Sequence, residues 1–262
     1  MMTIGITETY DPCWVPDWEK RLKDVNVIIT KQLSDDMISK LVEHKDNCIL
    51  HLTCTGFGGS KYEPNVPKLD WTYGQFKKFV SSGFPISQVV LRIDPILPFS
   101  SNHLKYVEFV LHAFSSCTVR YDKKLRCRVS MVDLYPHVIE RFSEANIRLP
   151  WTSFHAPRTA FEQVNRLLRK YEQHYEFESC AESGFDQTLV KQTGCATVKD
   201  IELLGKNTSE FTKQLNGTRK GCLCLSKTNI LGVTPGRCPH QCIYCYWKDT
   251  PSKELNVCTT LF

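Results

Sequence analysis

The sequence predicts one α/β domain, in which about six or seven parallel strands are joined by crossover helices and curve into a partial (β/α) barrel. Three observations lead to this prediction. Short β-branched runs alternate with amphipathic stretches along the chain, as in a parallel sheet with helical crossovers. Its 262 residues, 42% of them hydrophobic, are enough to bury one large core. No internal repeat, low-complexity tract or long linker divides the chain, so we expect a single domain over residues 1–262.

Several runs are predicted strands because they are short, apolar and rich in β-branched residues. In chain order they cover residues 3–7, 25–30, 48–54, 88–93, 127–132, 175–180 and 229–234. Ser34 is a predicted N-cap for one helix, and a second helix has a one-sided apolar stripe. That stripe consists of Phe161, Val164, Leu167, Leu168 and Tyr171. Residues 183–227 are less regular, and we expect an insertion there, followed by the final strand and a loop over 228–262.

Composition narrows the setting in which the protein works. The stretch MMTIGITETYDP lacks the basic region and apolar core of a secretion signal, and no run approaches the ~18 apolar residues of a membrane helix. We therefore expect a cytoplasmic protein without a membrane partner. Thirteen cysteines in such a chain favour metal or redox chemistry over a disulfide framework. A formal charge of +5 permits a nucleotide or nucleic acid partner but is too small to indicate one.

Polar side chains follow successive predicted strands, at the end of a barrel where reaction sites are assembled. They are Lys31, the glycine turn at Gly56, Gly58 and Gly59, Arg92 with Asp94, Asp133, and Cys180 with Glu182. We expect them to contact a ligand. Two structural alternatives stay open: a tight strand-to-helix connection for the glycines, and a salt bridge between Arg92 and one of the acids.

The densest cluster of reactive residues lies near the end of the chain, in CPHQCIYC. Cys238, Cys242 and Cys245 have C-x3-C-x2-C spacing, which suits a [4Fe–4S] cluster because three thiolates hold three irons and leave the fourth open. A closed zinc site would need a fourth ligand, from His240 or a distant cysteine. A ferredoxin run would have C-x2-C-x2-C spacing and a fourth cysteine before proline. The spacing therefore favours a three-cysteine cluster.

This motif resembles the signature of radical S-adenosylmethionine (SAM) enzymes, with Tyr244 as the aromatic residue before the third cysteine. Its position after the last strand is similar to that in an uncharacterised family, domain of unknown function 1848, whose members resemble circularly permuted TIM-like radical SAM barrels. Further blocks look like that family's in the same order: TK (30–31), LTCTGFGGSKYEPNVP (52–67), LRIDPI (91–96), VDLY (132–135), CAE (180–182) and GCLC (221–224). The chain departs where the family commonly has Arg-Arg-Thr-Asp, because it has TETYDPCW there. A more distant resemblance is to spore photoproduct lyases.

The resemblance implies a radical SAM enzyme. The three-cysteine cluster would bind SAM, and an electron from a reductant such as flavodoxin or ferredoxin would cleave it to a 5′-deoxyadenosyl radical that abstracts hydrogen from a substrate. Tyr244 would lie near the adenine, and the glycine turn near SAM's polar groups. Lys31, Arg92, Asp94, Asp133 and Glu182 would bind SAM or substrate. The substrate is unidentified, and a nucleotide or nucleic acid base is one class that the lyase resemblance suggests.

Two expectations concern the ends of the barrel and the other cysteines. In a closed or nearly closed barrel the first strand lies beside the last, so Glu8 is expected to hold SAM's ammonium group. Cys180, Cys195, Cys222 and Cys224 are expected to bind a second [4Fe–4S] cluster, with zinc or free thiols as the alternatives. A non-catalytic zinc or iron–sulfur module is the alternative to the enzyme.

Overall fold

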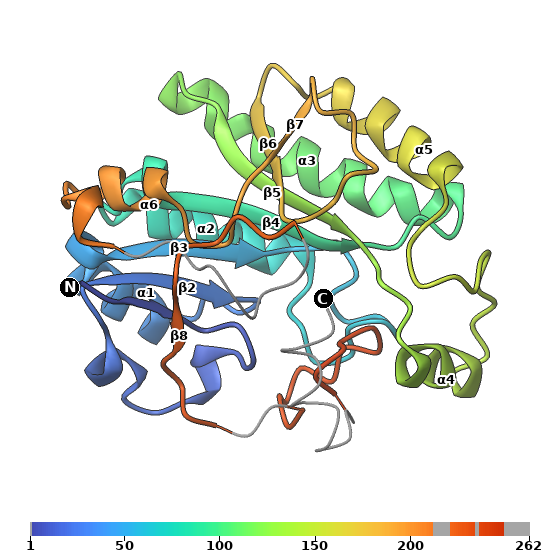
Figure 1. Ribbon diagram of the computed structural model, residues 1–262, viewed down its shortest axis with the longest axis horizontal. Helices are drawn as coiled ribbons and strands as arrows, with labels where there is room; N and C mark the ends of the chain where they lie inside the picture. The colour runs from blue at the N-terminus through green and yellow to red at the C-terminus, as the bar shows by residue number, and fades with distance from the viewer. Residues whose placement is uncertain (1, 212–220, 234–235, 249–262) are drawn as a thin grey trace.

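The computed structural model describes residues 2–211, 221–233 and 236–248 (Figure 1). The strands are β1 (Ile4–Ile6), β2 (Val25–Thr30), β3 (Cys48–Thr53), β4 (Val89–Ile96), β5 (Leu125–Met131), β6 (Tyr175–Ser179), β7 (Val190–Gln192) and β8 (Thr228–Asn229). The α-helices are α1 (Asp35–Glu43), α2 (Leu69–Ser81), α3 (Ser101–Tyr121), α4 (Pro136–Glu144), α5 (Arg158–Arg169) and α6 (Val198–Leu203). Short 3-10 helices cover Pro12–Trp14, Trp18–Arg21, Lys45–Asn47, Ile86–Gln88 and Thr208–Glu210.

The strands of the described chain form one sheet in the order β7-β6-β5-β4-β3-β2-β1-β8. Every neighbouring pair is parallel. The predicted α/β class with a parallel sheet is therefore confirmed, and the described sheet has eight strands. Strands that follow one another in sequence are neighbours, except that β8 returns to the far edge and pairs with β1.

Each predicted strand corresponds to a strand of the structure, and two details differ. The sequence did not predict β7, which has three residues and lies in the irregular segment. The last predicted strand, 229–234, is shorter than expected, because β8 covers Thr228–Asn229 and Gly232 has a φ of +62°, outside the extended region. Residues 212–220, 234–235 and 249–262, which belong to the predicted insertion, the end of the predicted last strand and the final loop, lie outside the described residues.

Helices α1, α2, α3 and α5 cover one face of the sheet and enclose the main core (Figure 1). The Ser34 hydroxyl accepts a hydrogen bond from the Met37 amide at 3.3 Å, so the predicted N-cap of α1 is confirmed. The predicted stripe of α5 is buried at Phe161, Val164, Leu167 and Leu168, and Tyr171, which follows the helix, is half-buried against the same core. None of the helices in the described part of the chain is both long and apolar enough to cross a bilayer.

The other face of the sheet is polar in its middle strands. Side chains alternate across a strand, so Arg126 and Arg128 of β5 lie on the same side. Glu178 of β6 accepts from both: from Arg126 Nε at 3.1 Å and from Arg128 Nη2 at 2.7 Å. Helix α6 adds Asp200, whose Oδ1 lies 2.7 Å from Arg126 Nη1. These ion pairs are buried and lie below the polar carboxyl ends of the strands.

Candidate functional site

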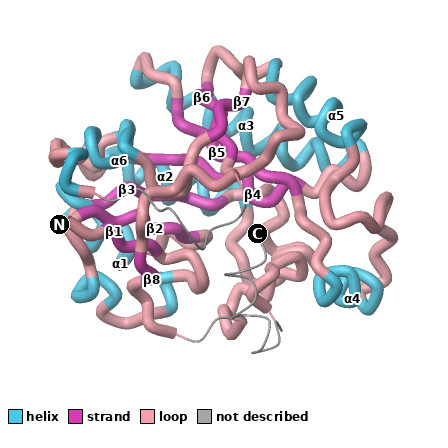
Figure 2. Tube along the Cα trace, in the orientation of Figure 1, coloured by secondary structure: helices cyan, strands magenta, loops and turns pink. Residues whose placement is uncertain are grey.

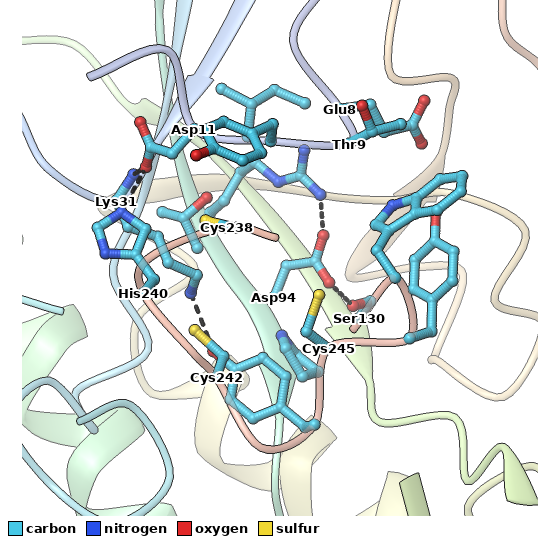
Figure 3. Close-up of a pocket in the computed structure, with 18 of the residues that line it drawn as sticks. Glu8, Thr9, Asp11, Lys31, Asp94, Ser130, Cys238, His240, Cys242 and Cys245 are labelled. Carbon is cyan, nitrogen blue, oxygen red and sulfur yellow. Dashed lines mark hydrogen bonds and ion pairs between the residues drawn. The ribbon is translucent and has the colours of Figure 1, made fainter. Parts of the chain in front are cut away.

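The residues at the carboxyl ends of the strands line a cavity of about 500 Å³, shown in Figure 3. Most of the residues predicted to bind a ligand line this cavity: Glu8, Lys31, Arg92, Asp94, Asp133, Tyr244, Cys180, Cys195, Cys222, Cys224, Cys238, Cys242 and Cys245. The structure therefore brings both cysteine groups to one cavity. Figure 2 shows that loops surround the cysteine segment at this end of the molecule, with α4 nearby.

The loop that carries Cys238, Cys242 and Cys245 has no regular secondary structure, and side chains from α4 hold its shape. Arg141 donates to three of its carbonyl oxygens: Nε to Ile243 at 2.8 Å, Nη2 to Cys245 at 2.5 Å and Nη1 to Lys248 at 2.5 Å. One guanidinium fork thus fixes the main chain around the second and third cysteines.

Asp11 fixes the other end of the loop. Its buried carboxylate accepts from the Lys31 amide at 2.6 Å and the Thr30 hydroxyl at 2.7 Å, and it lies 2.8 Å from His240 Nε2. The other ring nitrogen of His240 lies 3.1 Å from the Asn65 carbonyl oxygen. Burial alone would raise the pKa of Asp11, but the hydrogen bonds from these partners lower it. The carboxylate therefore links the N-terminal segment, β2 and the cysteine loop.

Lys31 and Tyr244 meet at Glu63, which the sequence did not indicate as a site residue. Lys31 Nζ lies 2.7 Å from Glu63 Oε1 and 2.9 Å from the Tyr244 hydroxyl, and that hydroxyl donates to Glu63 Oε1. Thr55 donates to the other carboxylate oxygen at 2.7 Å. Burial alone would raise the pKa of Glu63, but the Lys31 charge lowers it. The group is a buried, satisfied ion pair at the cavity wall.

The glycine turn does not line the cavity. Gly56 has a φ of +86°, and a Cβ on Gly58 would lie 1.9 Å from the Pro67 carbonyl oxygen, so both positions serve a tight loop. The amide of Gly59 donates to the Glu63 carbonyl at 2.9 Å. The turn thus positions Glu63. It does not itself line the cavity where it was expected to contact SAM.

Arg92 and Asp94 form an ion pair that lines the cavity, so the salt-bridge alternative holds for this pair. Ser130 donates to the other oxygen of Asp94 (Figure 3). Burial alone would raise the pKa of Asp94, but the Arg92 charge lowers it. Arg92 Nε is buried without a hydrogen-bond partner in the described part of the chain. The pair therefore presents a fixed positive and a fixed negative group to the cavity.

The N-terminal segment lies beside β8, as the sequence predicted. Gly5 pairs with Thr228, and the side-chain amide of Asn229 donates to the Thr9 hydroxyl at 2.6 Å. Glu8 lines the cavity and accepts from Lys227 Nζ at 2.9 Å. The carboxylate expected to hold an ammonium group thus already lies against one cation.

Asp133 and Glu182 have different positions. Asp133 lines the cavity, and its Oδ1 lies 3.1 Å from Nδ1 of His155, whose side chain is exposed. Glu182 is buried behind the cavity wall, where it accepts from the Met131 amide at 3.3 Å. Of the two, Asp133 is the one placed to contact a ligand.

The four other cysteines that line the cavity gather at the wall formed by the end of β6 and the segments around them. The sulfurs of Cys180, Cys195 and Cys224 all lie within 4.8 Å of one another, and Cys222 Sγ lies 3.9 Å from Cys180 Sγ. Hydrogen bonds with the Cys180 thiol, which have the larger effect, and with Cys224 lower the pKa of Cys222 to about 3. Burial instead raises the pKa of Cys238 in the loop to about 11. The donor sets of both groups, free thiols on one cavity, fit metal centres.

Comparison with known proteins identifies a family. The model of a family described as a domain of unknown function (DUF1848) matches residues 12–247, which is most of the chain. No curated protein and no solved structure matches the chain.

Proposed function

The chain belongs to the domain of unknown function 1848 family, and from this membership and the chemistry of the cavity we propose that the protein is a radical SAM enzyme. The observation that carries the proposal is the placement of Cys238, Cys242 and Cys245. They lie on one loop at the carboxyl ends of parallel strands, and they line the cavity with charged groups of both signs.

The strand order supports a permuted partial TIM-like barrel as the setting. Counted from β8, the sheet reads β8, β1, β2 and onward to β7, so every strand lies beside its successor. In this order the cysteine loop follows the first strand of the sheet. That is the place of the signature in most radical SAM enzymes, so a permutation of the chain accounts for the late position of the loop.

The three loop cysteines would hold a [4Fe–4S] cluster, and the open iron would bind SAM. When bound and reduced, the cluster would supply the electron that cleaves the sulfonium bond of SAM to methionine and a 5′-deoxyadenosyl radical, which abstracts hydrogen from a substrate. The chain's own part is to bind and orient SAM and substrate, and to exclude water from the cavity. Glu8 and Asp94 offer carboxylates to an ammonium group, and Arg92 offers a guanidinium to a carboxylate.

The cavity volume of about 500 Å³ lies within the range of ligand pockets, and SAM and substrate would share it. One wall is aromatic: Tyr135, Tyr246 and Trp247 line the cavity, and the rings of Tyr135 and Tyr246 are stacked at 5.6 Å. Planar rings such as nucleobases stack on such walls, so a nucleotide or nucleic acid base is the substrate class we favour. A flavodoxin or ferredoxin in the cytoplasm would supply the electron.

The test is SAM cleavage by anaerobically reconstituted protein after reduction with dithionite. We expect the wild-type protein to be brown and to convert SAM to 5′-deoxyadenosine. The variant with Cys238, Cys242 and Cys245 replaced by alanine should lose the loop iron and fall to the background rate. Cys117→Ala, which removes a thiol on α3 away from the cavity, is the matched control and should retain activity.

Two outcomes would reject the proposal. One is full SAM cleavage by the triple variant. The other is a colourless, zinc-loaded wild-type protein that takes up no iron on reconstitution, which would favour the non-catalytic metal-binding module.

A further inference from the structure

Outside the loop, four cysteines form a tighter group than the loop cysteines do: Cys180, Cys195, Cys222 and Cys224. The sulfurs of Cys180, Cys195 and Cys224 lie within 4.8 Å of one another, and Cys222 Sγ is 3.9 Å from Cys180 Sγ. We call these four residues the thiol quartet. In the described part of the chain, the three loop cysteines form no such compact group.

The spacing of sulfurs differs between a single ion and a cluster. Metal–sulfur bonds of about 2.3 Å place the thiolates of one tetrahedral ion about 3.8 Å apart. A [4Fe–4S] cube holds its thiolates further apart, because each one bonds a different iron. The 3.9 Å separation of Cys180 and Cys222 matches the single ion.

The surrounding main chain is built to bring the four sulfurs together. A Cβ on Gly194 would lie 2.6 Å from Cys224 Cα, so the two segments that carry Cys195 and Cys224 can approach this closely only with glycine there. On the other side, Ala181 has a φ of +57°, an uncommon conformation for alanine. It lies directly after Cys180, where the chain turns at the end of β6.

The neighbouring groups suit negatively charged thiolates. The Cys195 amide donates to Cys224 Sγ at 3.0 Å, the kind of contact that supports metal-bound sulfur. Lys227 lies three residues after Cys224, its side chain is only 13% exposed, and its ammonium is paired with Glu8. Four thiolates on a divalent ion leave a net negative charge, and a buried lysine beside them offsets part of it.

We propose that the thiol quartet binds one tetrahedral zinc ion, in place of the second iron–sulfur cluster expected from the sequence. Four protein thiolates close the coordination sphere, so the ion is structural. It ties the end of β6 to the segments at 193–197 and 221–225, and the latter leads directly into β8. The ion thereby fixes the wall from which Lys227 and Glu8 face the cavity. This inference does not depend on SAM chemistry.

The experiment is metal analysis of the full chain purified anaerobically without added metal, then reconstituted with iron and sulfide. We expect about one zinc per chain and, in the loop, about four irons. The double variant Cys222→Ser, Cys224→Ser should lose the zinc and keep the iron. The variant with the three loop cysteines replaced should keep the zinc and lose the iron, and Cys117→Ala should keep both.

Cobalt provides a second measurement that does not depend on the folding of the double variant. Wild-type protein whose zinc has been exchanged for Co²⁺ should show the intense visible bands of a tetrahedral thiolate complex. About eight irons in the wild type, with half of them lost in the double variant, would overturn the proposal in favour of a second cluster. So would zinc that persists in the double variant, or octahedral cobalt spectra. Zinc in the quartet without SAM cleavage would overturn only the proposed function.

Discussion

Arg141 is the side chain on which the shape of the cysteine loop depends most directly. It is buried, and its guanidinium donates to the carbonyls of Ile243, Cys245 and Lys248. A planar fork with fixed donors can serve three carbonyls at once, whereas a lysine ammonium on a flexible stem holds them in no fixed arrangement. The loop has no strand or helix of its own and few main-chain hydrogen bonds, so this residue supplies much of what holds its carbonyls in place.

We predict that Arg141→Met releases the loop and lowers the iron retained after reconstitution and desalting by at least about fivefold, the effect of losing more than ~1 kcal/mol of positioning energy. Arg141→Lys should give an intermediate loss. The far-ultraviolet circular dichroism spectrum should stay unchanged, because α4 does not need this side chain to form. Arg158→Met, which removes a guanidinium that is 91% exposed, is the control. Full iron retention in Arg141→Met would contradict the prediction.

At the residue scale, the sequence identifies motifs of consecutive residues but not contacts between residues that are far apart in the chain. The loop cysteines are recognisable because their spacing is a property of eight consecutive residues. Asp11, Glu63 and Arg141 carry no such signal, because their partners lie 229, 181 and 102 residues away. Only the folded sheet brings them to the loop. The Gly56 turn is the opposite case. Its glycines are recognisable in the sequence, but the sequence does not reveal that they position Glu63.

At the scale of elements, the pairing of β1 with β8 determines where the cysteine loop begins. Gly5 lies between two neighbouring strands, and a Cβ there would meet Asn26 Oδ1 at 2.5 Å and Ile230 Cγ2 at 2.8 Å. Asn26 cannot move aside easily, because its amide donates to the Lys23 and Asn47 carbonyls. The absence of a side chain at position 5 therefore permits β8 to dock.

We predict that Gly5→Ala destabilises the protein by about 1–3 kcal/mol through overpacking. The added methyl group would push β8 away from β1. The thiol quartet and the cysteine loop, which flank β8, should therefore both retain less metal. Gly74→Ala is the matched control: Gly74 lies within α2, and a Cβ there meets nothing within 4 Å. That change should raise the free energy of unfolding by about 0.5–1 kcal/mol. The measurements are urea denaturation and metal content, and equal stability of Gly5→Ala and wild type would refute the argument.

The elements themselves were largely predictable, because the strands of this sheet are buried runs of β-branched residues and the helices have one apolar face. The exceptions are the last two strands. β7, with three residues, was not predicted, and β8, with two, is shorter than predicted; both exist because a longer neighbour supplies the hydrogen-bonding edge. Their positions follow from tertiary pairing, which a local pattern does not contain.

At the scale of the whole molecule, the side of the sheet opposite the main helices carries paired charges in its middle strands. Branched apolar side chains are usual inside α/β barrels. Here Arg126, Arg128 and Glu178 form a buried network, and Asp200 of α6 completes it. The sequence could not reveal this, because alternating polar residues in a strand look the same whether they face water or a polar interior.

Glu178 is the centre of that network, since it is the carboxylate that pairs with both arginines. We predict that Glu178→Gln lowers the free energy of unfolding at pH 7 by about 3–5 kcal/mol, because it leaves Arg128 buried beside a neutral amide. Glu176→Gln on the same strand is the control. Its carboxylate is 44% exposed and paired only with Lys199, so the change should stay within about 0.5 kcal/mol.

The pH dependence gives this prediction its sharpest form. Burial alone would raise the pKa of Glu178, but the charges of Arg126 and Arg128 lower it from its ordinary value of 4.5. A carboxylate with a lowered pKa in the folded state stabilises the protein fully above its unfolded pKa, and this contribution is lost as pH falls through the folded pKa. The difference between wild type and Glu178→Gln should therefore be constant from about pH 5.5 to 8 and shrink below about pH 4.5. Urea denaturation across this range, down to the lowest pH at which the wild type remains folded, measures it. A difference that is absent at pH 7, or that grows on acidification, would show that the network contributes no net stability through Glu178.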